Sequence, residues 1–118
     1  MDLFKNMKIA VSSTGKNLES KVDEIFGRCP YFIIVEFKDN KIKGSVTVKN
    51  LVSRQTSGAG IATARMIVEK GANIIITGSI GPRALDVLRQ FEVKVYFGKG
   101  LVKDVLQQFI NSELREAK

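Results

Sequence analysis

The sequence of 118 residues has no histidine, no tryptophan and a single cysteine, Cys29. One cysteine cannot form an intramolecular disulfide, and a zinc site with two or more cysteine ligands is excluded. Histidine and cysteine supply most transition-metal ligands, so metal chemistry would have to depend on Cys29, on carboxylates or on the backbone. General acid–base catalysis by histidine is excluded for the same reason.

Long apolar runs are also missing. No stretch reaches the roughly 18 consecutive apolar residues of a membrane span, and residues 1–6 lack the apolar centre of a signal peptide. We therefore expect a cytoplasmic protein with no membrane partner. Residues 1–6 are predicted to be a short N-terminal extension, and Met7 could itself be the biological start.

The composition is typical of one globular domain, with 44% hydrophobic and 26% charged residues. The 19 basic and 12 acidic side chains give a formal charge of 19 − 12 = +7. This excess is spread along the chain, with ten basic and six acidic residues in the first 60 positions and nine and six in the rest. Without a basic tail or block, nucleic acid is not an expected partner.

The first half of the chain reads as three strands. Residues 7–13 are apolar and end in small polar side chains, and residues 31–37 are apolar on both faces. A turn at Asp39-Asn40 leads into residues 41–49, which alternate between apolar and polar positions. Ile42, Val46 and Val48 are predicted to face inward, and the lysines on the other face indicate an edge strand.

From residue 58 the pattern changes to helices alternating with short strands. Helices are predicted at residues 58–70, after Pro82, and from Val102 to Ile110, and strands at residues 73–77 and 93–97. The order β-β-β-α-β-α-β-α predicts an α/β fold with one mixed sheet of five strands in the order 3-2-1-4-5 and helices on both faces. The predicted domain spans residues 7–114, and residues 115–118 form a C-terminal tail.

In open α/β sheets, ligands bind at the carboxyl ends of strands beside the topological switch point. In the predicted sheet this point lies between the first and fourth strands. Ser12, Ser13, Gly78 and Ser79 follow those strand ends, so we expect them to border a crevice.

Two glycine-containing helix starts are candidate anion sites. Ser57, Gly58 and Gly60 open the first helix, where free amide N–H groups and the helix dipole can bind an anion. The alternative is an ordinary N-cap formed by the hydroxyls of Thr56 and Ser57. Gly78 and Ser79 precede the second helix, and their N–H groups could face the same crevice; the alternative is a short strand-to-helix connection whose glycines permit unusual dihedral angles. The chain has neither a P-loop nor a dinucleotide-binding glycine pattern.

Arg28 and Cys29 form the third candidate segment. The guanidinium of Arg28 can bind an oxyanion through several N–H donors, and a thiolate at Cys29 would be a soft ligand for copper, iron–sulfur or molybdenum–sulfur species. Cysteine is also among the most buried residue types, so a purely structural role for Cys29 is the alternative.

Three segments together resemble one protein family. Residues 26–32 (FGRCPYF), 58–62 (GAGIA) and 78–85 (GSIGPRAL), followed by residues 93–96 (VKVY), are similar in order and spacing to the dinitrogenase iron-molybdenum cofactor biosynthesis family, which includes nitrogenase accessory factors. The resemblance covers about residues 7–114. It implies a ribonuclease-H-like three-layer fold and noncovalent binding of an anionic iron-, molybdenum- or copper-sulfide cluster. Relatives often have histidine before Phe-Gly-Arg, where this chain has Ile25, so a histidine-ligated cluster is excluded.

These observations lead to a noncatalytic carrier as the first functional hypothesis. Its ligand would be an anionic metal-sulfide cluster or its oxoanion precursor. The candidate ligand-binding residues are Ser12, Ser13, Arg28, Cys29, Ser57, Gly58, Gly60, Gly78 and Ser79, with Cys29 as the metal ligand. The alternatives are an adaptor that regulates a cluster-assembly protein without a bound cluster, and a phosphometabolite-binding domain. Nuclease chemistry is not expected, because the strand ends carry no carboxylates to hold divalent ions.

Overall fold

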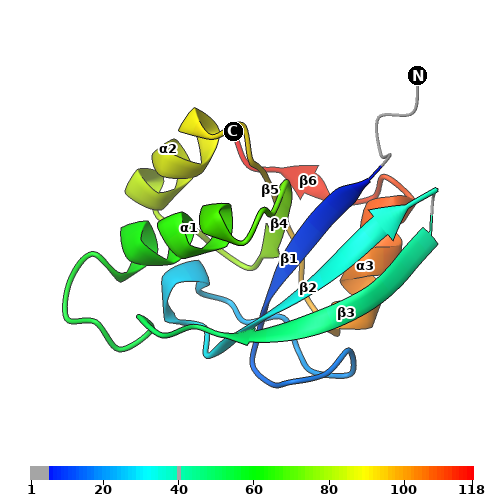
Figure 1. Ribbon diagram of the computed structural model, residues 1–118, viewed down its shortest axis with the longest axis horizontal. Helices are drawn as coiled ribbons and strands as arrows, with labels where there is room; N and C mark the ends of the chain where they lie inside the picture. The colour runs from blue at the N-terminus through cyan, green and yellow to red at the C-terminus, as the bar shows by residue number, and fades with distance from the viewer. Residues whose placement is uncertain (1–5, 40) are drawn as a thin grey trace.

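The protein is described from a computed structural model that covers residues 6–39 and 41–118. Six strands form one sheet in the order β3-β2-β1-β4-β5-β6 (Figure 1). β1 runs parallel to β4, and β4 runs parallel to β5, while the other neighbours are antiparallel. The strands are β1 (Met7–Ser13), β2 (Tyr31–Lys38), β3 (Lys41–Lys49), β4 (Ile74–Thr77), β5 (Lys94–Phe97) and β6 (Arg115–Glu116).

Three α-helices cover the two faces of the sheet. The helices are α1 (Ala59–Glu69), α2 (Pro82–Gln90) and α3 (Val102–Ile110), and a short 3-10 turn, η1 (Phe26–Arg28), precedes β2. Helices α1 and α2 lie side by side over one face, and α3 lies on the opposite side (Figure 1). The predicted three-layer α/β arrangement and the order of the first five strands are therefore confirmed.

Alternation along the central strands builds a core on each face. In β1, Ala10 faces the cluster that packs under α1 and α2, whereas Ile9 and Val11 face the cluster under α3. In β4, Ile75 faces the cluster under α1 and α2, and its neighbours Ile74 and Ile76 face the cluster under α3. Because both faces are covered, Ile9–Val11 of β1 and Ile74–Ile76 of β4 are apolar on both faces, as is typical of central parallel strands.

The edge strand β3 differs from its prediction in one respect. It lies at the edge of the sheet, as its lysines indicate. However, Ile42 and Val46 are 38% and 64% exposed, and only Val48 packs partly against the core. The alternation of apolar and polar residues shows only that these side chains share one face of the strand. They would be buried only if a helix covered that face, and most of β3 lies beyond the helices.

A sixth strand replaces part of the predicted tail. Residues Arg115 and Glu116 pair antiparallel with Phe97 and Tyr96 of β5, and the N–H of Ala117 donates to Val95 (2.8 Å). A two-residue strand of charged side chains has no apolar periodicity, so the sequence pattern did not indicate it. The predicted extension at residues 1–5 and the turn residue Asn40 lie outside the described residues.

No helix in the described part of the chain has the length and apolar character needed to cross a membrane.

Candidate functional site

A hollow of about 430 Å³ opens where three distant segments of the chain meet. One segment is η1 with the residue before it, the second is the start of α1, and the third is the loop that leads into α2. The lining residues are Ile25, Phe26, Gly27, Arg28, Gly58, Ala59, Gly60, Ile61, Ser79, Ile80, Gly81, Pro82, Arg83 and Ala84. The three segments with the family-like motifs therefore converge on one pocket.

One wall of the pocket is fixed by backbone hydrogen bonds between the β1–β2 connection and the end of β4. The N–H of Phe26 donates to the carbonyl of Ser79 (3.1 Å), and the N–H of Gly78 donates to that of Asp23 (3.3 Å). A Cβ atom on Gly78 would lie 2.6 Å from the Cα of Glu24, a distance that backbone atoms cannot tolerate. Glycine is therefore required at position 78 for the two segments to approach so closely.

A second close approach joins η1 to α1. A Cβ atom on Gly27 would lie 2.8 Å from both the N and the Cα of Gly60. On its other side Gly60 faces the Cβ of Ala84 in α2, at 3.4 Å from an added Cβ. These contacts bring the starts of α1 and α2 together and place both beside η1.

Both helix starts lack a side-chain cap. Gly58 is the N-cap of α1, with a left-handed φ of 70°, and Gly81 is the N-cap of α2. The hydroxyls near the start of α1 do not form the predicted cap. The amide N–H groups of residues 59–61 and 83–84 precede the first hydrogen bonds of their helices, so they remain available to a ligand in the pocket.

Two arginines add positive charge to the pocket. Arg28 is exposed and donates through one nitrogen, Nη1, to the carbonyls of Ser53 (3.1 Å) and Gln55 (2.6 Å). Arg83 lies in the first turn of α2 and is exposed. Among the described residues, the lining contains no aspartate, glutamate, cysteine or histidine, although the carboxylate of Asp23 lies just outside it and accepts from the N–H of Ile25 at the mouth (3.0 Å).

Apart from these donors, the lining is mostly apolar. Ile25 is 53% exposed at the mouth, and Ile61 and Ile80 are partly buried inside it. The single hydroxyl, that of Ser79, already donates to the carbonyl of Glu24 (2.7 Å). An anion that binds here would meet N–H donors and hydrocarbon rather than metal-ligating side chains.

The pocket brings together four of the predicted site residues, namely Arg28, Gly58, Gly60 and Ser79. Gly78 contributes to the wall, and Ser57 is exposed just before the helix start. The remaining three, Ser12, Ser13 and Cys29, are buried and do not line the pocket.

Ser12 and Ser13 are removed from the surface by the chain that crosses the ends of β1 and β4. The Oγ of Ser12 is hydrogen-bonded to the carbonyl of Asp23 (2.9 Å) and to the Oγ1 of Thr77 (2.8 Å). The Oγ of Ser13 donates to the carbonyl of Gly15 (2.8 Å). The predicted crevice at the topological switch point is therefore filled by the protein itself, and we leave both serines out of the proposed site.

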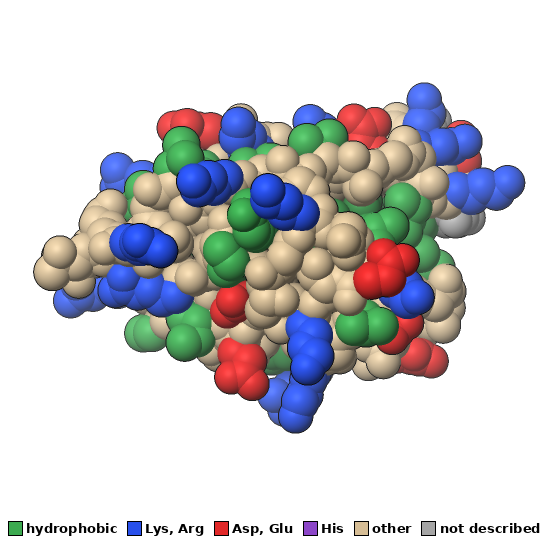
Figure 2. Space-filling view, turned by 90° about the horizontal axis from the view of Figure 1, so that it is seen from below, with side chains coloured by type: hydrophobic (Ala, Val, Ile, Leu, Met, Phe, Trp, Pro, Cys, Tyr) green, Lys and Arg blue, Asp and Glu red, His purple; other side chains and the backbone are tan. Residues whose placement is uncertain are grey.

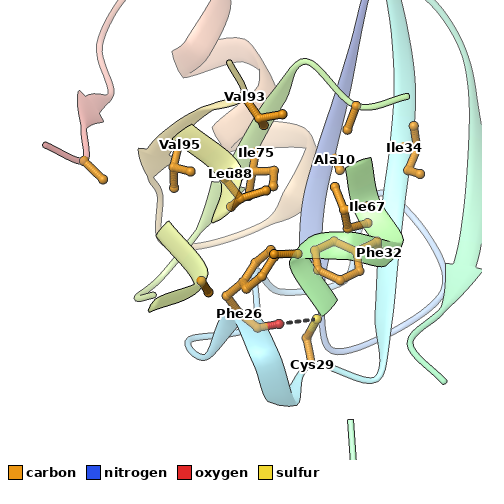
Figure 3. Packing of buried hydrophobic residues seen from close by; sticks show 14 residues of the cluster. Ala10, Phe26, Cys29, Phe32, Ile34, Ile67, Ile75, Leu88, Val93 and Val95 are labelled. Atoms are coloured by element: carbon orange, nitrogen blue, oxygen red, sulfur yellow. Dashed lines mark hydrogen bonds between the residues drawn. The ribbon is translucent and has the colours of Figure 1, made fainter. Parts of the chain in front are cut away.

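Cys29 belongs to the core under α1 and α2 (Figure 3). Its thiol donates to the carbonyl of Phe26 (3.2 Å), and its sulfur accepts from the Nδ2 of Asn50 (3.9 Å). Burial, together with the nearby charge of Asp23, raises the pKa of Cys29 to about 12. A fully buried, protonated thiol is not a ligand for a cluster in the pocket, so we also leave Cys29 out of the site.

The described residues contain no group of three or more histidine, cysteine, aspartate or glutamate side chains that could hold a metal ion. Residue types that bind metal cations directly are thus absent from the pocket and are not gathered elsewhere in the described part of the chain.

Arg83 is the pocket residue that sequence reasoning missed. The sequence did contain a signal for Arg83, namely a basic residue in the first turn of a predicted helix, where acidic residues are usual. The apolar residues Ile25, at the mouth, and Ile80, partly buried inside the pocket, were also missed, since only the folded chain shows that the pocket reaches them.

A second hollow of about 830 Å³ lies on the other side of the wall formed by Glu24, Gly78 and Ser79. Its charged lining is mixed, with Lys21 and Lys99 beside Glu24 and Glu113. Although it is larger, it offers neither an uncapped helix start nor an excess of one charge, so the smaller pocket is the better candidate for an anion.

On the face of the molecule shown in Figure 2, charge does not define a separate binding patch. On the side seen in Figure 2, Lys and Arg side chains are spread over the surface with Asp and Glu between them, rather than gathered in one patch. The net charge of +7 thus contributes a general attraction for anions.

Comparison with known proteins agrees with the motif resemblance. Residues 7–112 match the family described as Dinitrogenase iron-molybdenum cofactor. An uncharacterized protein of Methanocaldococcus jannaschii is 36% identical over 92 residues, which are 78% of this chain and 75% of that protein.

Two solved structures share the fold over nearly their whole lengths. The orange protein of Desulfovibrio gigas, solved in its apo form, has a TM-score of 0.86 and 31% identity, with 96% of this chain and 95% of that chain covered. A Thermotoga protein solved by NMR has a TM-score of 0.77 and 31% identity, with 93% and 92% covered. From these matches and the convergence of its three motif segments, the chain belongs to the dinitrogenase iron-molybdenum cofactor family.

Proposed function

We propose that the protein is a noncatalytic carrier that binds a preassembled anionic metal-sulfide cluster in the pocket between η1, α1 and α2. The observation that carries this proposal is the combination of two uncapped helix starts and two arginines around a pocket without any acidic, cysteine or histidine side chain. Such a site attracts negative charge and cannot form a bond from a side chain to a metal ion.

The absence of metal-ligating side chains in the lining defines the kind of cargo. A free iron, copper or molybdenum cation would need protein ligands, whereas a cluster whose metals are already surrounded by sulfide needs only outer contacts. Amide N–H groups can donate to its sulfur atoms, and the hydrocarbon of Ile25, Ile61 and Ile80 suits a polarizable, weakly hydrated anion better than a strongly hydrated one.

The same lining supports the proposed lack of catalysis. Ser79 is the only hydroxyl, and it is already bonded to the carbonyl of Glu24, so no nucleophile, general acid or general base faces the pocket. The family membership supports a role connected with the iron–molybdenum cofactor. The relative from Desulfovibrio gigas was solved in its apo form, a term used for proteins that also have a ligand-bound form.

The contacts predict moderate affinity. Each helix start contributes about 0.3 to 1 kcal/mol, and a charge-assisted hydrogen bond contributes about 1.5 to 3 kcal/mol. A nanomolar complex requires about 12 kcal/mol and a micromolar one about 8 kcal/mol. Two helix starts and two charge-assisted hydrogen bonds together contribute about 4 to 8 kcal/mol, so we expect binding no tighter than micromolar, which would allow the cargo to be passed to an acceptor protein.

The proposal is tested by anaerobic incubation of the full chain with tetrathiomolybdate, alone and with copper or iron, followed by gel filtration on a column equilibrated with the same mixture, so that a ligand bound with micromolar affinity is not lost during the run. We expect a charge-transfer absorption and stoichiometric molybdenum that elute with the protein. Iron or copper salts without sulfide are the control and should not be retained. A protein that emerges with no colour or molybdenum above that of the column buffer in every mixture would contradict the proposal.

The edge strand favours a second candidate function, an adaptor for a cluster-assembly protein. β3 has one unpaired edge, and Val46 and Ile42 are exposed on it. An adaptor would form a stoichiometric complex with a protein even when no cluster is present. Size-exclusion chromatography of the apo protein with purified cluster-assembly proteins would distinguish it from a carrier that needs its cargo.

A further inference from the structure

Arg83 occupies a position that is unfavourable for a cation in the ligand-free protein. It lies in the first turn of α2, at the positive end of the helix dipole, and no acidic residue is present in that turn. The N-cap, Gly81, provides no side-chain acceptor. The start of α2 thus lacks both features that normally stabilise a helix start, a cap and an acidic residue, and it has a positive charge instead.

The other arginine of the pocket has a different environment. The Nη1 atom of Arg28 donates to two carbonyls of the loop before α1, those of Ser53 and Gln55. This loop leads directly to Gly58, whose left-handed backbone begins α1. Arg28 therefore has a structural partner in the ligand-free protein, whereas the surroundings of Arg83 favour an anion.

We propose that Arg83 is the residue that determines the charge preference of the pocket by contacting the bound anion, and that Arg28 is a positioning residue that holds the loop in front of α1. This assignment rests on the proposed function, because it names the roles of two arginines within the same site. It predicts that anion affinity depends on the positive charge at position 83, and that the conformation of the loop before α1 depends on the shape of the guanidinium at position 28.

The experiment compares Arg83→Gln, Arg83→Lys, Arg28→Gln and Arg28→Lys with the wild type, and with Arg65→Gln as a matched control on the exposed face of α1. Tetrathiomolybdate affinity is measured as a function of salt concentration, and trypsin cleavage after Arg54 reports the loop before α1. Arg83→Gln should weaken binding roughly tenfold and reduce its salt dependence, and Arg83→Lys should restore most of both.

Neither substitution at Arg83 should change the rate of cleavage after Arg54. Both substitutions at Arg28 should increase that rate severalfold, since a single lysine ammonium does not reproduce the planar guanidinium that bonds both carbonyls. The control Arg65→Gln should match the wild type in both measurements. Wild-type affinity in Arg83→Gln, or unchanged cleavage in both Arg28 variants, would overturn the assignment.

A ligand-free measurement separates this inference from the proposed function. Replacing Arg83 by Glu restores the usual charge at the start of α2, so Arg83→Glu should raise the Tm of the apo protein by roughly 2 to 5 °C. If the wild type fails to bind tetrathiomolybdate, the proposed function fails, but the rise in Tm still tests whether Arg83 is placed against the helix dipole. An unchanged or lower Tm would overturn the role of Arg83.

Discussion

The helices of this protein begin in two different ways. At the start of α3, the N–H of Val102 donates to Ser20 (2.8 Å), the N–H of Lys103 donates to Leu18 (2.9 Å), and Asp104 lies in the first turn. The starts of α1 and α2 have glycine N-caps, no side-chain cap and no acidic residue in the first turn. One helix start is completed by the chain itself, and the other two are left open beside a pocket.

This difference is informative because α2 and α3 both follow the carboxyl end of a parallel strand. Position in the fold alone does not make a binding site. At α3, carbonyls of the connection between β1 and β2 accept hydrogen bonds from the first amide groups of the helix. At α2, the same connection forms one wall of the pocket and does not bind the first amide groups of that helix, so they remain available. The polar groups that a fold leaves without partners indicate where a ligand can bind.

The largest effect is expected from a substitution in the wall beside the open helix start. Gly78→Ala places a methyl group 2.6 Å from the Cα of Glu24, so it should lower the free energy of unfolding by about 2 to 3 kcal/mol. Gly81→Ala is the matched control, because nothing lies within 4 Å of its added Cβ, and it should change stability by about 0.5 kcal/mol or less. Urea denaturation measures both, and equal losses would contradict the role of the wall.

The thiol of Cys29, in the core under α1 and α2, should react slowly with alkylating reagents in the native protein. At about pH 8, iodoacetamide should modify Cys29 at least about 100-fold more slowly in the native protein than in urea, since the thiol is buried and protonated. Mass spectrometry follows the reaction. Similar rates in the two states would place the thiol within reach of the pocket.

The same thiol predicts a dependence of stability on pH. The folded protein keeps the proton of Cys29 until about pH 12, whereas the ordinary pKa of the thiol is 9.0. The contribution of Cys29 to stability is therefore complete below pH 9.0 and is lost as the pH rises toward 12. Cys29→Ala should show less of this alkaline loss in urea denaturation, and an identical pH profile would contradict the assignment.

An intermediate effect is expected when an open helix start is given a cap. Gly81→Asp should stabilise the ligand-free protein by about 0.5 to 1 kcal/mol, because its carboxylate can accept from the amides of α2 and opposes the dipole. It should also weaken tetrathiomolybdate binding. Gly81→Asn separates the two causes, since it caps without charge and should reduce binding less. An affinity equal to that of the wild type in Gly81→Asp would show that these amides do not meet the ligand.

The smallest effect is expected at the closed helix start. Asp104→Asn should lower stability by about 0.3 to 0.5 kcal/mol, and the loss should shrink at high salt, because the carboxylate interacts with the dipole of α3 from an exposed position. Anion binding should be unchanged. A loss of tetrathiomolybdate affinity in this variant would show that the closed start also contributes to binding.

Most of the fold was predictable from periodicity. β1, β3 and α3 have the predicted bounds, and the other long elements differ by a residue or two at their ends. The prediction failed where a pattern carries too little information. β6 has only two charged residues, Arg115 and Glu116, and it exists because β5 offers an unpaired edge. Val46 alternates like a core residue, but no helix covers it.

For the site, the sequence alone determined that the family-like glycine segments exist, that no histidine can bind a metal and that no acidic residue stands in the segments where α1 and α2 begin. Only the tertiary structure decided which residues face the pocket. Ser12, Ser13 and Cys29 are buried because another part of the chain crosses the strand ends, while Arg83 and Ile25 reach the same hollow. Periodicity reports which side of its own strand or helix a side chain occupies, but access to solvent depends on segments that are distant in the sequence.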